Sequence, residues 1–243
     1  MRSDPRTTRR AALSLAAGLA LGTALPAMAQ DAPKLKIGVI GAGNIGGTIG
    51  GLWAKAGHKV MFSSRHPEAL KPLVESLGPN ASAGTPEEAI RFGDAVFVAV
   101  PYKAYPDLAR EYGAALKGKV AIEAGNATKA RDGELYDEVQ ANGIGITSQK
   151  YLPGARVVRA FSAINYKIFA KNAAGREGGR MAVPIAGDDK AALALAEGLV
   201  RDAGFEPVLV GGLNDAGKFA MGSPGFGHDL TAPELRRTLG LTQ

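Results

Sequence analysis

Three glycines in the first fifth of this sequence have the spacing of a phosphate-binding turn. Gly41, Gly43 and Gly46 form a G-x-G-x-x-G pattern between a short apolar run and a helical one, which is the context that a dinucleotide-binding fingerprint requires. Gly41 would allow a tight turn, Gly43 would let the backbone approach a pyrophosphate, and Gly46 would let helix and strand pack closely. Asn44 and Ile45 begin the helix, whose free N–H groups and partial positive charge favour phosphate. The pattern therefore predicts a dinucleotide site at these five residues.

The end of the second expected strand indicates which dinucleotide would bind. NAD sites usually have Asp or Glu there, about 20 residues past the glycines, to bond the ribose 2′-hydroxyl. This sequence has Ser63, Ser64 and Arg65 instead, with no carboxylate before Glu68. Hydroxyls and a guanidinium suit a 2′-phosphate, and one contact of about 1.5–3 kcal/mol would favour NADP by roughly ten- to a hundredfold. NADP is the expected cofactor; the alternative is that the serines cap a turn and Arg65 is solvated.

Two later segments would end beside the cofactor, since ligands of open α/β sheets bind at the carboxyl ends of the strands. Val100 and Pro101 end the apolar run 94–100, and we expect them to line the ribose and nicotinamide side of the site. Asn126 follows the run 119–123, and its amide would contact the nicotinamide ribose. The alternative that Asn126 only caps a turn stays open.

Other polar or flexible positions near this edge have less definite roles. Tyr102 and Tyr105 either face a substrate or pack a loop, and Glu123, at a strand end, is expected to be a paired structural carboxylate rather than a general base. The glycine-rich stretch 220–229 either folds over the edge of the active site or connects to a final helix. The sequence offers no clear general acid or base, so the catalytic residues are not assigned.

Composition excludes several other kinds of site. The 243 residues include no cysteine and three histidines, none in a spaced pair, so disulfides, thiolate zinc sites and histidine-built metal sites are not expected. The net charge of +6 is divided evenly: residues 1–29 hold +3, and the remainder holds +3 without a run of Lys and Arg interleaved with aromatics. A nucleic-acid partner is therefore not expected.

Strand-like and helix-like segments alternate after residue 33. This alternation predicts an α/β fold, a Rossmann-type doubly wound, mostly parallel sheet with helices on both faces. Pro184 favours an edge position for its strand, because proline cannot donate to a central ladder. A capping Thr85, followed by Pro86 and then Glu88, indicates a helix start. The expected strands are 35–40, 59–63, 94–100, 119–123, 156–161, 181–186 and 205–210, and the other expected helical segments are 44–56, 189–203, 213–221 and 232–239.

The first 29 residues have the three-part anatomy of a secretory signal peptide. A basic region is followed by an apolar run over 11–25 and by Ala27-Met28-Ala29, which predicts cleavage before Gln30. The apolar run is too short for a permanent anchor. Arg9-Arg10 before it resembles a twin-arginine export signal; an ordinary secretory signal is the alternative. We expect an exported, periplasmic protein with an NADP-binding domain over 30–212 and a C-terminal helical tail of the same domain over 213–243.

The mature chain resembles the NADP oxidoreductases of the coenzyme F420-dependent family, from about Lys34 to Gly212. It is also similar to the NADPH-binding domain of the six-transmembrane ferric reductases. The resemblance implies direct hydride transfer between NADP(H) and a deazaflavin (coenzyme F420) or flavin, with the glycine loop holding the pyrophosphate and Ser64 and Arg65 holding the 2′-phosphate. The segments that carry it are 37–46, Ser63-Ser64-Arg65, Val100-Pro101, 157–161 and 186–189.

The sequence departs from the family pattern at two places near the expected acceptor side. Asn126-Ala127 stands where the family usually has Asn-Pro, and Ala160-Phe161-Ser162 stands where it has Ala-Phe-Asn. These departures leave the acceptor open among a deazaflavin, a flavin and a related small redox molecule.

Two other functions remain open. An imine or hydroxyacid reductase would share the N-terminal unit, but such enzymes usually add a long helical domain, for which few residues remain after 210. A non-catalytic NADP-binding or sensor protein is the second alternative, and turnover with a flavin or quinone would distinguish it. The expected partner is a small-molecule redox acceptor; a homodimer is compatible with the sequence, and no stable membrane anchor is expected after cleavage.

Overall fold

The computed structural model describes residues 33–242, so the predicted signal peptide over 1–29 lies outside the described residues. These residues contain an eight-stranded sheet. Each strand expected from the sequence is present within about three residues of its predicted bounds, and a short strand, β3, was not predicted. The strands are β1 (Lys36–Ile40), β2 (Lys59–Ser63), β3 (Ala81–Gly84), β4 (Ala95–Val98), β5 (Val120–Glu123), β6 (Arg156–Arg159), β7 (Ala182–Gly187) and β8 (Glu206–Gly211).

Helices connect the strands, and several of them were not predicted. The 3-10 helices are η1 (Pro67–Leu70), η2 (Tyr102–Ala104) and η3 (Leu213–Phe219). The α-helices are α1 (Asn44–Lys55), α2 (Lys71–Leu77), α3 (Pro86–Phe92), α4 (Tyr105–Leu116), α5 (Lys129–Asp132), α6 (Glu134–Asn142), α7 (Ile144–Tyr151), α8 (Tyr166–Asn172), α9 (Lys190–Asp202) and α10 (Ala232–Thr238).

The strand order is β3-β2-β1-β4-β5-β6-β7-β8. The first six strands run parallel, β7 pairs antiparallel with β6, and β8 runs parallel to β7. This confirms the predicted doubly wound, mostly parallel sheet. The chain leaves β1 in one direction to form β2 and β3, and returns on its other side with β4, so the strand order reverses between β1 and β4. Such a reversal creates a ligand-binding crevice at the carboxyl ends of the two strands.

The predicted edge position of Pro184 is wrong. β7 lies between β6 and β8. Pro184 is tolerated there because β6 pairs only with the end of β7, at Ala186 and Gly187. Pro184 therefore lies outside the β6–β7 ladder and is paired only with Val208 of β8. Its missing N–H removes no hydrogen bond between β6 and β7.

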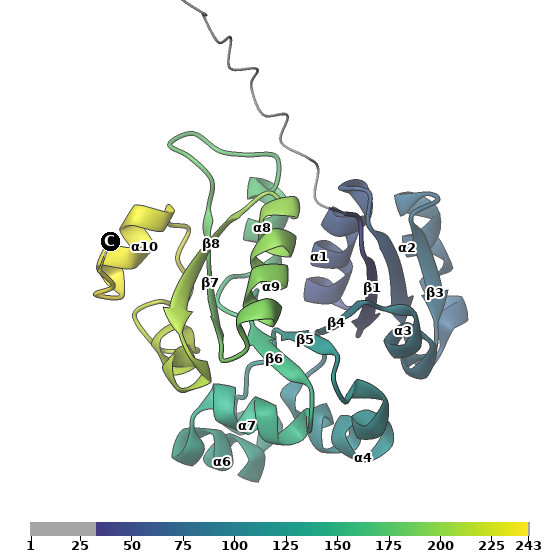
Figure 1. Cartoon of the computed structure of the whole chain (residues 1–243), viewed down its shortest axis with the longest axis horizontal. Helices are drawn as coiled ribbons and strands as arrows, with labels where there is room; N and C mark the ends of the chain where they lie inside the picture. Colours follow the sequence, from purple (N-terminus) through teal and green to yellow (C-terminus); the bar gives the residue numbers. More distant parts are fainter. Residues whose placement is uncertain (1–32, 243) are drawn as a thin grey trace, which may run out of the picture. The chain divides into compact units, whose positions relative to one another are not determined.

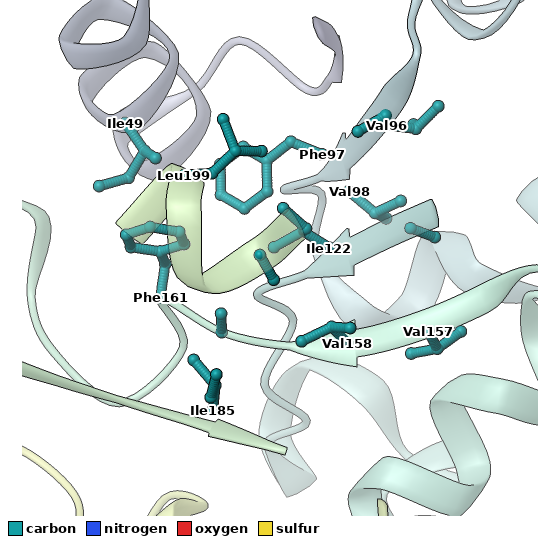
Figure 2. Packing of buried hydrophobic residues seen from close by; sticks show 14 of the residues in the cluster. Ile49, Val96, Phe97, Val98, Ile122, Val157, Val158, Phe161, Ile185 and Leu199 are labelled. Atoms are coloured by element: carbon teal, nitrogen blue, oxygen red, sulfur yellow. The ribbon is translucent and has the colours of Figure 1, made fainter. Parts of the chain in front are cut away.

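Helices cover both faces of the sheet. α1 contacts α2, α8 and α9 on one face, while α3, α4, α6 and α7 form a continuous series of contacts on the other (Figure 1). Figure 2 shows Phe97 of β4 and Phe161 directed toward Ile49 of α1 and Leu199 of α9, and these side chains are buried. The strands are apolar on both faces because helices exclude water from each.

Local signals explain where the helices begin. The Thr85 hydroxyl accepts the Glu88 N–H and the Glu88 carboxylate accepts the Thr85 N–H, which confirms the capping box predicted for α3. The Asp189 carboxylate accepts the Ala192 N–H at 2.8 Å and caps α9. α1 differs from both, because its N-cap is Gly43 and no side chain caps it.

Within residues 33–242, no helix is long and apolar enough to cross a membrane. The same residues contain no cluster of three or more His, Cys, Asp or Glu side chains that could hold a metal ion.

Candidate functional site

A cleft of about 720 Å³ lies at the point where the strand order reverses. Its volume falls in the range typical of small-molecule and cofactor sites, about 300–1,000 Å³. Eleven cofactor residues were predicted, and ten of them belong to the glycine turn, the end of β2 and the end of β4. The cleft is lined by seven of the predicted residues, Gly41, Gly43, Ser63, Ser64, Arg65, Val100 and Pro101.

 Of the other four, Gly46 packs against the turn, Asn44 and Ile45 are the first residues of α1, and Asn126 lies elsewhere, as described below.

Gly41 and Gly46 must be glycine for different structural reasons. Gly41 has φ 95°, a left-handed conformation that glycine adopts without steric cost. A Cβ on Gly46 would lie 1.9 Å from the Gly41 carbonyl oxygen, so only glycine lets α1 pack against the turn. Both of these predicted structural roles are confirmed.

Gly43 differs, because the protein's own packing does not require a glycine there. Its φ is −75°, and a Cβ at this position would have no protein atom within 4 Å. The space in front of Gly43 therefore opens onto the cleft, where a bound group could approach the backbone closely. This open space fits the pyrophosphate of a dinucleotide.

The N-terminus of α1 faces this region without a competing anion. α1 has twelve residues, no side-chain cap and no acidic residue in its first turn. Its first N–H groups have no partner within the helix, and the helix dipole adds a partial positive charge. The turn can therefore supply both hydrogen bonds and favourable electrostatics to phosphate.

The residues at the end of β2 contribute differently from one another. The Ser63 hydroxyl is buried and donates to the Val39 carbonyl at 2.8 Å, and the Ser64 hydroxyl accepts the His66 N–H at 3.0 Å. Both serines thus shape the turn, although the Ser64 hydroxyl can still donate its own hydrogen. Arg65 is exposed at the cleft and forms no ion pair with an acidic residue of 33–242. Its guanidinium is therefore available to an anion.

The cleft also has residues that the sequence analysis did not identify. They come from η1, α3, η2 and α4, elements whose approach to the cleft is set by the tertiary fold. No local spacing distinguishes them from ordinary helix residues. The apolar members are Leu70, Pro86, Ala104 and Leu108, with Tyr112 beside them, and the charged members are Lys103, Asp107 and Glu111.

A second cavity, of about 530 Å³, lies beyond the carboxyl end of β5. Asn126 lines this cavity and is not among the residues that line the cleft. The segment 220–223 also lines this cavity, so the first part of the glycine-rich stretch borders it. Lys129 is the only charged residue of this lining; the other residues are Ala127, Thr128, Tyr136, Val139, Gln140, Gly143, Ile144 and Gly217.

A buried ion pair lies behind Asn126. Arg159 Nη1 donates to Glu123 Oε1 at 2.6 Å, and both side chains are fully buried. Glu123 Oε2 also accepts from the Tyr105 hydroxyl at 2.9 Å and from the Gly125 N–H at 3.0 Å. Glu123 is thus a paired structural carboxylate, as predicted, and both of its oxygens accept hydrogen bonds.

Arg159 extends this network to the second cavity. Its Nη1 donates to the Gly125 carbonyl and its Nη2 to Asn126 Oδ1, each at 2.7 Å. Asn126 Nδ2 in turn donates to the Ser162 carbonyl at 2.7 Å. The network therefore joins the ends of β5 and β6. The sequence analysis missed Arg159, because an arginine inside an apolar strand gives no local signal of its partners.

Tyr102 and Tyr105 face the interior rather than a substrate. Both are buried, and their rings stack with centroids 4.3 Å apart. Burial, together with the nearby Glu123 charge, raises the pKa of both tyrosines above the ordinary value. They remain protonated at neutral pH and act as hydrogen-bond donors of the core.

Asp132 connects the loops after β4 and β5. Its Oδ1 accepts the Lys103 N–H at 2.9 Å, and its Oδ2 accepts the Thr128 N–H at 2.6 Å. Arg131 pairs with Asp132 and also donates to the Asn126 carbonyl. Although burial alone would raise the pKa of Asp132, the bonds from Arg131, Thr128 and Lys103 hold it below the ordinary value. The carboxylate therefore stays charged and fixes the two loops that flank the site.

Comparison with protein families agrees with the predicted resemblance. Residues 36–127 match the family described as NADP oxidoreductase, coenzyme F420-dependent. The chain is also 30% identical over 187 residues to the metalloreductase STEAP3 of Rattus norvegicus. That match covers 77% of this chain and 36% of the relative, so this chain spans little more than a third of that protein.

Two solved structures show the same fold. A hypothetical protein from Sinorhizobium meliloti superposes with a TM-score of 0.67 at 23% identity, covering 82% of this chain and 96% of the other. A protein from Arthrobacter, described as a candidate F420-dependent NADP reductase, has a TM-score of 0.66 at 22% identity, covering 81% and 99%.

Proposed function

We propose that the chain transfers a hydride between NADP(H) and a deazaflavin, a flavin or a similar small acceptor, as the match of residues 36–127 to the F420-dependent NADP oxidoreductase family suggests. The observation that carries the proposal is the cleft itself. It combines an uncapped helix N-terminus, a glycine with open space before it and a free arginine at the end of β2.

The proposed cofactor runs across the carboxyl edge of the sheet. Its pyrophosphate lies on Gly43 and the first N–H groups of α1, including those of Asn44 and Ile45. Its 2′-phosphate lies at Arg65 and the Ser64 hydroxyl, where charge-assisted bonds favour it over a plain hydroxyl. Apolar side chains of the cleft, among them Leu70 and Leu108, offer a surface for the adenine.

The acceptor would occupy the second cavity. A dinucleotide that extends from the glycine turn past Val100 and Pro101 brings its nicotinamide toward the end of β5, next to this cavity. When bound, the nicotinamide supplies the hydride. The protein orients the two molecules and excludes water, which is consistent with a site that has no evident general acid or base.

The first test is the affinity for NADPH and NADH, measured by fluorescence titration of the purified chain and of Arg65→Ala. We expect the wild type to prefer NADPH, and Arg65→Ala to lose at least tenfold in NADPH affinity with little change for NADH. Arg91→Ala is a matched control, since Arg91 is an exposed arginine already paired with Glu87, and it should bind both cofactors as the wild type does.

Other results would change the proposal. Equal affinity for NADPH and NADH in the wild type would remove the assignment of Arg65 to the 2′-phosphate. Failure to bind either cofactor would reject the proposed function.

Export through residues 1–29 belongs to the same proposal, with the hydride acceptor then located in the periplasm.

A further inference from the structure

The buried Arg159–Glu123 pair is not explained by stability alone. Both groups are fully buried, and the cost of removing two charges from water largely cancels their attraction. The pair does, however, fix the position of a side chain that reaches the second cavity. Arg159 Nη2 is 2.7 Å from Asn126 Oδ1, so the guanidinium determines how this amide is turned.

The amide of Asn126 can have only one orientation in this network. Arginine has donors and no acceptor, so the atom of Asn126 that faces Arg159 is the oxygen. The atom that faces the Ser162 carbonyl, at 2.7 Å, must be the nitrogen, because a carbonyl only accepts. The two contacts agree, and together they hold the carboxamide from both sides.

This orientation leaves one N–H group for a ligand. Nδ2 carries two hydrogens, and the Ser162 carbonyl is its only partner within the described residues. Asn126 is partly exposed and lines the second cavity. The second N–H of Nδ2 is thus available to a group bound in the cavity, whereas Oδ1 already accepts from Arg159.

The backbone after β6 helps to place this contact. Phe161 has φ 59°, the only non-glycine residue with a positive φ within 33–242, a conformation that costs about 1–3 kcal/mol. Its ring is held in the core against Trp53, Phe97 and Phe169. The chain turns sharply there, and the Ser162 carbonyl meets Asn126.

We propose that Asn126 is a catalytic hydrogen-bond donor of the second cavity, that Arg159 is the residue that positions it, and that the acceptor is a conjugated carbonyl compound such as a quinone or flavin ring. This inference rests on the proposed function. A fixed donor aimed at an oxygen that gains negative charge stabilises the transition state more than the ground state.

The electron balance is simple. NADPH loses a hydride, which forms a bond to a carbon or nitrogen of the conjugated acceptor, and the displaced π-electron pair moves to the carbonyl oxygen. The Asn126 N–H stabilises that oxygen, which then takes a proton from water. The products are NADP⁺ and the two-electron-reduced acceptor. Mostly uncharged groups line the cavity, which suits a neutral ring.

The test compares Asn126→Asp with the wild type, using riboflavin and menadione as acceptors. Asp has the same shape but no N–H, so kcat should fall at least a hundredfold with both acceptors. The affinity for NADP⁺ should change less than threefold, and riboflavin binding without NADPH, followed by riboflavin fluorescence, should weaken about tenfold. Asn80→Asp is the matched control, and its kcat should match the wild type. Asn80 lies just before β3 and bonds to Lys59 and to the Ala54 carbonyl.

Arg159→Lys separates positioning from folding. The lysine keeps a charge beside Glu123, but one nitrogen cannot occupy the places of both Nη1 and Nη2. We expect the melting temperature to stay within a few degrees and kcat to fall at least tenfold at unchanged KM for NADPH.

Three outcomes would overturn the inference. Loss of NADP⁺ affinity in Asn126→Asp with unchanged kcat would make Asn126 a cofactor residue. NADPH binding without reduction of either acceptor would reject the carbonyl class while leaving the dinucleotide site in place. Unchanged kcat in Arg159→Lys would remove the positioning role. Absence of NADPH binding, in contrast, would reject the proposed function itself.

Discussion

The cleft at β1 and β4 and the second cavity beyond β5 differ in how their polar groups are connected to the protein core. The cleft presents backbone N–H groups, open space at Gly43 and the exposed Arg65, and none of these is part of the hydrophobic core. The second cavity depends on Asn126, which is fixed by a fully buried ion pair. On the proposed function, binding and stability are carried by different groups in the cleft, whereas the same groups carry both behind the second cavity.

This difference predicts how the two regions respond to substitution. A change at the cleft surface should alter affinity and leave the fold intact. Removal of a charge from the buried network should destabilise the protein, whereas Arg159→Lys, which keeps the charge, should mainly lower kcat. The following predictions test this contrast, starting with the largest expected effect.

Arg159→Met should destabilise the protein by about 3–5 kcal/mol, because it leaves the buried Glu123 carboxylate without its cation. The measurement is urea unfolding followed by tryptophan fluorescence. Arg156→Met, on the same strand, is the control: Arg156 is 43% exposed and lies 3.9 Å from Asp189, so its loss should cost less than about 1 kcal/mol.

A double-mutant cycle with Glu123→Gln sharpens this result. Once the carboxylate is neutral, Arg159→Met no longer leaves an unpaired charge, so the double variant should be less destabilised than the two single effects together imply. Strict additivity would show that the pair is not coupled, and the contrast between the two regions would fail.

The same contrast explains what could be predicted from the sequence. The glycine turn and Ser64-Arg65 are contiguous segments whose residue types carry their own chemical reasons, and the structure brings them to one cleft. Asn126 was placed beside the cofactor by its position after a strand, whereas its neighbour across the sheet, Arg159, is 33 residues away. Pairing between distant side chains has no local signature. The prediction for Pro184 was wrong for a related reason. A proline is tolerated in this central strand because the β6–β7 ladder is short, and the length of that ladder is known only from the assembled sheet.

Asp132→Asn should have a smaller, pH-dependent effect. The pKa of Asp132 in the folded protein lies below the ordinary 3.8, so its stabilisation is fully present above about pH 4 and is lost as the pH falls through the folded pKa. At pH 7 the variant should lose about 1–2 kcal/mol, or roughly 2–8 °C in melting temperature.

Thermal unfolding of wild type and Asp132→Asn between pH 7 and pH 3 would measure this effect. The two melting temperatures should converge toward pH 3. Asp137→Asn is the control, because Asp137 pairs with Lys129 on the surface and should have almost no effect at pH 7. A constant difference across the whole range would mean that Asp132 acts through packing rather than charge.

Gly43→Ala should have the smallest effect on stability and a clear effect on binding. An added Cβ has no protein atom within 4 Å and φ is already negative, so the free energy of unfolding should change by less than about 1 kcal/mol. The same methyl group would occupy the space that we assign to the pyrophosphate, and NADPH affinity should fall at least tenfold. Gly46→Ala is the opposite case, since its Cβ would lie 1.9 Å from the Gly41 oxygen and should cost about 1–3 kcal/mol or more. If Gly43→Ala bound NADPH normally, the open space at Gly43 would not be a phosphate cradle, and the separation of binding from stability in the cleft would be lost.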